Sequence, residues 1–440
     1  MNKKLYLRLI SYLAIWQIYL FFMSINSPLG TDWLEWHTQR LFNFSEYYKI
    51  NGFFSNYTFS IWSSCNDCSL LKENWTDKIY LSQNLFSNFQ YVLFNYFFGE
   101  INFKTFGHII DKLVILLTGI LIAELSIIFS NKNLNFFQIN PKSLLIFTFF
   151  IINPWTYKMI LAGWIHVYFL MFFLLGILML NYKKQILGLL FFLIASFFDY
   201  QSSAGLFTFY IFILIFSKIK KNQDLLSIYY PRYKNYKFFE LKLFFSILLP
   251  IIVFFVFKQF ALEDLNNLNS GSSLLGRIGI SGNDIHNGGI LGALQFLGGN
   301  RITLCLSNFS GNLSSMSLDT KIEIFNCTLS ILSMFAVSVI SLFGLFIIYK
   351  YEEKFFNLII FPLLFLLLSF VFILQQSSSV HLMGYSYYFS LLFALGLSYL
   401  IMHLLRKFNY SLISICFSFP LIFGLIILCL RVNMLTGTGG

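Results

Sequence analysis

Charged side chains are scarce in this sequence of 440 residues. Asp, Glu, Lys and Arg make up 11% of the chain, whereas a soluble domain carries about 25% charged residues. So few charges cannot cover the surface of a water-soluble fold, and 57% of the residues are hydrophobic. The composition therefore excludes a soluble protein and predicts one that lies within a membrane.

Three further features are missing. The chain has no internal repeat, no low-complexity linker, and no clear small-residue cleavage site after its first apolar segment. We therefore interpret residues 1–440 as a single integral membrane domain whose first apolar segment is a retained helix.

The apolar residues fall in blocks of about 14 to 25, the length scale set by a bilayer core of about 30 Å. They predict an all-α polytopic membrane protein with about eleven transmembrane helices. The fifth and sixth segments are near or below spanning length, so they either cross the membrane or form a re-entrant hairpin. The predicted segments are 9–26, 108–129, 143–157, 163–181, 186–199, 204–217, 243–259, 326–349, 355–374, 386–403 and 410–430.

Lysine and arginine gather in alternate short loops between these segments. Of the short turns assigned to the outside, only one is basic, through Lys158. This asymmetry follows the positive-inside rule and predicts a multi-pass protein with its N-terminus cytoplasmic and its C-terminus external. The many Lys, Asn, Ile and Phe residues suggest a bacterial source, so the expected location is the bacterial inner membrane. The net charge of +11 is then mostly a topology signal. It indicates contact with membrane lipids, above all along the basic segment 218–242, and no nucleic-acid partner.

Two long external loops, about 27–107 and 260–325, lack obvious helical periodicity and are the expected location of function. Four cysteines accompany them: Cys65 and Cys68 in the first loop, Cys305 and Cys327 at the second. In an oxidising compartment they form disulfides or remain free thiols. Metal or redox chemistry is less favoured, because no second Cys-x-x-Cys or paired histidine completes a site.

The first external loop opens with Asp32, Glu35 and His37. On a short helix, Asp32 and Glu35 would share one face, and paired carboxylates suit general base catalysis or metal binding. The alternative is a capping box at the start of a surface helix.

Further polar residues converge on the same predicted external face. They come from the ends of several apolar segments, as expected where a polar substrate meets a lipid-embedded one. They are His108, Asp111, Lys158, His166, Asp199, His381 and Tyr385.

These residues carry a resemblance to the multi-pass GT-C class glycosyltransferases. It rests on Asp32 directly after the first helix, on Asn153-Pro154-Trp155 followed by Gly163-Trp164-Ile165-His166, and on the stretch from His381 to Tyr388. The resemblance implies an enzyme that takes a sugar from a polyprenyl-phosphate carrier. The sugar is transferred to a glycan, lipid or protein acceptor on the outer face.

By the same resemblance, Asp32 corresponds to the acidic residue that activates the acceptor hydroxyl or orients it with a divalent metal ion. Many family members have two acidic residues separated by one position, whereas two positions separate Asp32 from Glu35. The spacing therefore leaves open both the metal and the choice of base. The departing carrier phosphate needs cationic or donor partners, for which the candidates are Lys158, Arg277, Arg301 and His381.

Two other functions compete with this one. An O-antigen polymerase or ligase-like enzyme has a similar multi-pass body and would use Arg277 and Arg301, which lie among glycines that allow close approach of a phosphate or glycan. A non-enzymatic transporter of lipid-linked sugars is disfavoured. The sequence shows no paired broken helices, and Glu124 is the main charge within a predicted span.

Overall fold

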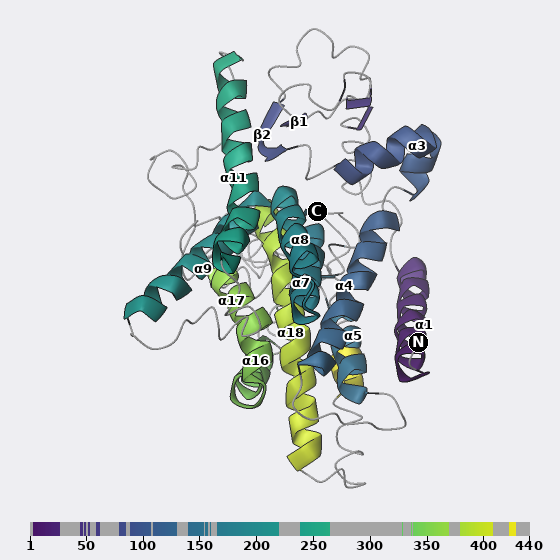
Figure 1. The fold of residues 1–440 in the computed structure, drawn as a ribbon. Helices are drawn as coiled ribbons and strands as arrows, with labels where there is room; N and C mark the ends of the chain where they lie inside the picture. Colours follow the sequence, from purple (N-terminus) through teal and green to yellow (C-terminus); the bar gives the residue numbers. More distant parts are fainter. Residues whose placement is uncertain are drawn as a thin grey trace, which may run out of the picture. The chain divides into compact units, whose positions relative to one another are not determined.

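The structure is a computed structural model, and the elements that it describes are almost entirely helical (Figure 1). The described residues are 3–26, 45–46, 48–49, 52, 59–61, 79–84, 89–106, 109–129, 140–153, 155–156, 159, 165–219, 238–264, 328, 336, 338–368, 379–407 and 422–427.

Each predicted apolar segment includes helical residues that the structure describes, which confirms the all-α fold. Two of the described helices contain spans long and apolar enough to cross a membrane, Phe239–Phe260 and Tyr387–Lys407. The helices in these segments are α1 (Lys3–Asn26), α4 (Ile109–Ile128), α5 (Pro141–Ile152), α7 (Ile165–Asn181), α8 (Gln185–Phe198), α9 (Tyr200–Ile219), α11 (Phe239–Asp264), Ser338–Tyr351, α16 (Glu353–Phe355), the π-helical turn η6 (Phe356–Ile360), α17 (Phe361–Leu368), α18 (Ser379–Lys407) and residues 422–427.

The segment predicted to be the first long external loop, about 27–107, contains regular structure that its sequence did not reveal. Helix α3 (Phe89–Phe106) is interrupted at Gly99, whose φ of 73° is a left-handed conformation that glycine adopts without strain. Strands β1 (Phe59–Ile61) and β2 (Ile79–Asn84) pair antiparallel, with Ile61 opposite Ile79. The loop is therefore partly a folded element.

The chain forms two compact units. Unit 1 comprises Met1–Leu29, Leu116–Met159 and Ile285–Gly440, and unit 2 comprises Gly30–Ile115 and Ile160–Asp284. Helix α4 passes from one unit to the other, so each unit is described by itself.

Helix α5 lies at the centre of unit 1, where it packs against both α1 and α18. It begins with a proline in its first turn and with Asn140 as N-cap, whose side chain accepts hydrogen bonds from the backbone N–H groups of Lys142 and Ser143. At its other end, Trp155 packs edge-on against Phe389 and Phe393 of α18. Eight of the 12 residues of α5 are buried.

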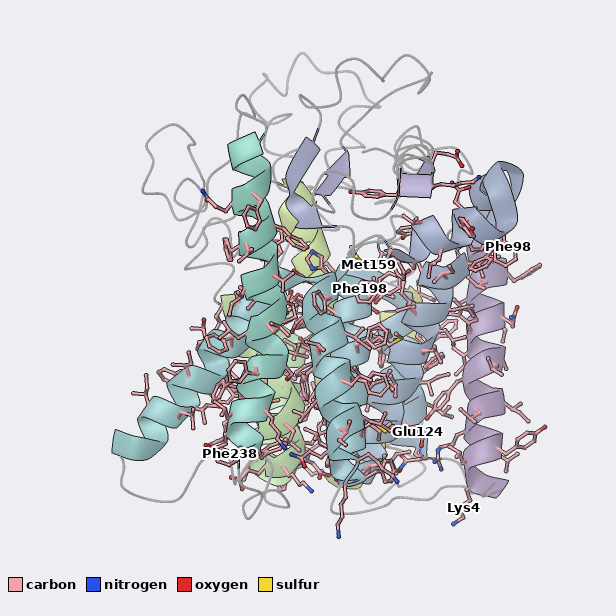
Figure 2. The ribbon with its side chains drawn as sticks, turned by 45° about the horizontal axis from the view of Figure 1, so that its top comes forward. Lys4, Phe98, Glu124, Met159, Phe198 and Phe238 are labelled. Carbon is pink, nitrogen blue, oxygen red and sulfur yellow. The ribbon has the colours of Figure 1, made fainter. Side chains whose placement is uncertain are left out.

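An ion pair joins α1 to α4 within unit 1. Arg8 of α1 forms a bidentate ion pair with Glu124 of α4, with Nε···Oε1 and Nη2···Oε2 distances of 2.8 and 2.7 Å, and Tyr12 donates a third hydrogen bond to this carboxylate. Figure 2 shows Glu124 toward the same end of the helices as Lys4. The charge at Glu124 is therefore neutralised by a cation from the start of the chain.

Two glycines let the helix Ser338–Tyr351 cross α18 at very short range within unit 1. A Cβ atom added at Gly344 would overlap the carbonyl group of Gly396, and one added at Gly396 would overlap the carbonyl of Ser341. Small residues at such crossings allow helix backbones to approach closely, which is a main source of stability between helices in a bilayer.

We expect Gly396→Leu to destabilise unit 1 more than an ordinary surface change would. Backbone atoms occupy the space that the new side chain needs, and overpacking of this kind costs about 1–3 kcal/mol. Thermal unfolding of the purified protein measures the loss. Gly424→Leu is the matched control, because a Cβ at Gly424 meets nothing within 4 Å. Equal melting temperatures for the two variants would contradict the close crossing.

Unit 2 is built around the neighbouring helices α7 and α8, with α11 packed against α8 and α9. Stacked aromatic rings fill these contacts: the ring centroids of Tyr200 on α9 and Phe254 on α11 are 3.8 Å apart. The connection between α8 and α9 is a single residue, Asp199, which follows Phe198 (Figure 2). Two functional candidates that the structure describes in unit 2, His166 and Asp199, meet at this connection.

Candidate functional site

Asp199 ends one helix and begins the next. Its backbone N–H donates to the carbonyl of Ala195 in α8, and its carboxylate Oδ1 accepts from the backbone N–H groups of Gln201 and Ser202 in α9, at 3.0 and 3.2 Å. Aspartate suits this position because its side chain satisfies the N–H groups that a helix start leaves without a carbonyl partner. These hydrogen bonds hold the Asp199 carboxylate at the junction of α8 and α9.

The second oxygen of the same carboxylate holds His166. The distance from Oδ2 to His166 Nδ1 is 2.6 Å, and the two side chains are 1% and 6% exposed. The Ser202 hydroxyl donates to this Oδ2 as well. His166 lies in the first turn of α7, so the contact ties α7 to the α8–α9 junction. A carboxylate held in this way orients the imidazole ring and selects which of its nitrogens carries a proton.

A second buried carboxylate, Asp111, lies in the first turn of α4 and accepts two tyrosine hydroxyls. Tyr91 of α3 donates to it at 2.7–2.8 Å, and Tyr168 of α7 donates at 2.5 Å. None of the three side chains is more than 3% exposed. Burial, together with the charge of Asp111, raises the pKa of Tyr91 well above its usual value, so this hydroxyl stays protonated and acts as a donor.

The two carboxylate groups belong to one packed region of unit 2. Tyr168 follows His166 by two residues on α7, and its ring stacks on that of Phe198 with centroids 4.8 Å apart and planes at 12°. Phe198 in turn precedes Asp199. The region therefore combines two carboxylates, a histidine and aromatic faces. Carboxylates and imidazoles bind hydroxyl groups and move their protons, which is the chemistry that a sugar or an alcohol acceptor requires.

Two of the residues predicted from the sequence to bind substrate, His166 and Asp199, are thus in direct contact. The backbones of His381 and Tyr385 lie on α18, in unit 1. The remaining candidates lie outside the described residues: Asp32, Glu35, His37, Lys158, Arg277 and Arg301. The cysteines considered for disulfides, Cys65, Cys68, Cys305 and Cys327, also lie outside them.

Sequence reasoning missed Tyr91 and Tyr168, and it placed Asp111 on this face without assigning it to the site. An aspartate in the first turn of a strongly apolar helix was the available signal for Asp111, because a carboxylate in such a position needs hydrogen-bond partners. No comparable signal marked Tyr91, because the sequence contains 25 tyrosines. The contact of Tyr91 with Asp111 follows from the position of α3 beside α4, which the sequence does not show.

No protein-family model matches the chain, and comparisons with curated proteins and with solved structures find no similar one. Within the described part of the chain, no three His, Cys, Asp or Glu side chains are grouped so that they could hold a metal ion. Asp32 and Glu35, the pair considered for a divalent metal, are not in that part.

Proposed function

We propose that the chain is a polytopic protein of the bacterial inner membrane with about eleven helices, an internal N-terminus and an external C-terminus. Contacts within unit 1 support the alternating direction of α1, α4 and α5 in this topology, whereas the orientation rests on the positive-inside rule. The start of α1 meets the end of α4 through Arg8 and Glu124, and the end of α4 meets the start of α5 through Lys142 and the Ser126 carbonyl. Helices that alternate in direction across a bilayer have such neighbouring ends.

We further propose that it is a glycosyltransferase of the GT-C type, acting on the outer face with a polyprenyl-phosphate sugar as donor. The acceptor hydroxyl oxygen bonds to C1 of the sugar. The bond from C1 to the phosphate oxygen breaks, and its electrons leave with the carrier phosphate. The hydroxyl proton passes to a carboxylate, for which Asp32 is the candidate and Glu35 its neighbour. A neutral hydroxyl is a poor nucleophile, so this proton acceptor is essential to the rate.

The observation that carries the proposal is the buried contact between His166 and Asp199. Both residues were assigned to a substrate site from the sequence, although 33 positions separate them. The proposed topology places the start of α7 and the α8–α9 junction on the external face, and Asp111, at the start of α4, belongs to that face too. Ionisable groups buried among apolar helices are costly, and they usually mark function.

In this proposal, His166, held by Asp199, binds a hydroxyl of the substrates. From the sequence, the partners expected for the carrier phosphate are Lys158, Arg277, Arg301 and His381. His37 and Tyr385 are the other residues expected to bind substrate. A divalent metal ion held by Asp32 and Glu35 would add positive charge beside the acceptor hydroxyl.

A transfer assay tests the proposal directly. Proteoliposomes containing the protein and a polyprenyl-phosphate sugar should glycosylate an added acceptor, and His166→Gln should slow transfer by roughly 10²-fold, since displaced reacting groups lose about this much rate. His403→Gln is the matched control. His403 lies near the end of α18, and its ring lies 5.7 Å from that of Tyr351.

The melting temperature of His166→Gln, measured in parallel, separates a functional loss from unfolding. Wild-type transfer rates in a well-folded His166→Gln protein would remove the observation on which the proposed site depends. Absence of transfer by the wild type, over a panel of lipid-linked sugars and acceptors, would count against the glycosyltransferase itself.

A further inference from the structure

Lys142 is a buried cation in the first turn of α5. Lys142 is only 3% exposed. The Nζ atom donates to the carbonyl of Ser126 and to the hydroxyl of Tyr399, both at 3.0 Å. Both acceptors are neutral, and an ammonium group has three N–H donors. Among the described residues, no carboxylate is within ion-pair distance of Lys142.

Arg406 brings a second positive charge to the same place. It follows Tyr399 by two turns on α18, and its charge acts electrostatically on Lys142. The Arg406 Nε atom is buried and makes no hydrogen bond to any residue that the structure describes. A buried N–H donor for which the described residues provide no acceptor is costly unless a ligand supplies one.

One acidic residue partly offsets these charges. Glu352 is 5% exposed and interacts electrostatically with Lys142, but two cations against one carboxylate leave a net positive charge. The surroundings are aromatic: the Phe355 and Tyr399 rings stack with centroids 6.2 Å apart. In such surroundings an uncompensated positive charge is strongly destabilising.

We propose that Lys142 and Arg406 bind the phosphate group of an anionic phospholipid. The guanidinium and ammonium groups are the usual protein partners of phosphate oxygens, the first as a planar fork and the second as a point charge. The proposed topology places the start of α5 and the end of α18 at the cytoplasmic surface. Basic sites between helices on this side bind lipid headgroups. The inference does not depend on glycosyl transfer.

Thermal unfolding of the purified protein tests this site. In nanodiscs of phosphatidylcholine alone, adding phosphatidylglycerol should raise the melting temperature of the wild type. Lys142→Met, which keeps the length of the side chain without its charge, should match or exceed the wild type in the neutral lipid, and it should lose most of the shift. Arg406→Met should also lose most of the shift, whereas Lys407→Met, which removes the neighbouring exposed cation, should retain it.

Several outcomes would overturn the proposal. If Glu352 alone compensates Lys142, then Lys142→Met will melt lower than the wild type in neutral lipid and will keep the phosphatidylglycerol shift. If Lys142→Met does not fold, an unchanged shift in Arg406→Met still contradicts the site. A shift of equal size from inorganic phosphate, at the same concentration, would assign the site to a soluble anion instead of a lipid.

Discussion

An Asp32→Asn protein should transfer sugar about 10² to 10⁴ times more slowly than the wild type, which is the usual contribution of a general base. Asparagine keeps the volume and a hydrogen bond but cannot accept a proton. Binding of the proposed lipid-linked donor should survive, because in this proposal helices elsewhere hold its apolar tail. The rate of transfer from a polyprenyl-phosphate sugar in proteoliposomes, normalised to the amount of folded protein, measures the effect.

Glu35→Gln is the matched comparison for Asp32→Asn. It should cost less than Asp32→Asn if Glu35 only orients the acceptor, and as much if the two carboxylates act together. Full activity of Asp32→Asn would remove Asp32 from the mechanism. If Arg277→Ala or Arg301→Ala is then severe while Asp32→Asn is mild, the O-antigen polymerase or ligase-like function becomes the better interpretation.

Replacing Asp111 with alanine should lower the free energy of unfolding more than other single changes in unit 2. The substitution removes the acceptor of two buried hydroxyls, those of Tyr91 and Tyr168. Each buried donor left without a partner costs about 1–3 kcal/mol. Denaturant or thermal unfolding, followed by loss of the native helical signal, measures the change.

A double-mutant cycle identifies the cause of this effect. If the orphaned hydroxyls account for the loss, Asp111→Ala should cost markedly less in a protein that already carries Tyr91→Phe and Tyr168→Phe. The tyrosine-to-phenylalanine changes also remove the donors, so the remaining apolar groups need no partner. An equal cost in both backgrounds would show that the carboxylate acts through something other than these tyrosines.

Most helix positions were predictable because each apolar segment is set off from polar loops. The segments 163–181 and 186–199 correspond to α7 (Ile165–Asn181) and α8 (Gln185–Phe198). An all-α fold follows from such segments, since only helices of this kind satisfy their own backbone groups in lipid. Part of the site, His166 and Asp199, was predictable for a related reason. Polar residues at the ends of apolar segments stand out from the apolar residues around them.

Partners distant in the sequence were not predictable. Glu124 stood out as a charge within a predicted span, but the sequence offered no sign that Arg8, 116 positions away, binds it. Helix α3 was missed because a mixture of Tyr, Phe, Asn and Gln hides its periodicity, and with it the contact of Tyr91 with Asp111. Packing decides these contacts, and a pattern read along the chain contains little information on packing.

The one-residue connection between α8 and α9 has a mechanical consequence. Two helices joined by a longer loop can tilt independently, because the loop absorbs the motion. Here a change in the angle between α8 and α9 must be taken up largely by the φ and ψ angles of Asp199, which are −140° and 95°. The same residue holds His166 through its side chain. Any bending at this joint therefore moves the imidazole. In the proposed topology, where α9 crosses the membrane, bilayer thickness and lateral pressure on α9 would act on the geometry of the histidine.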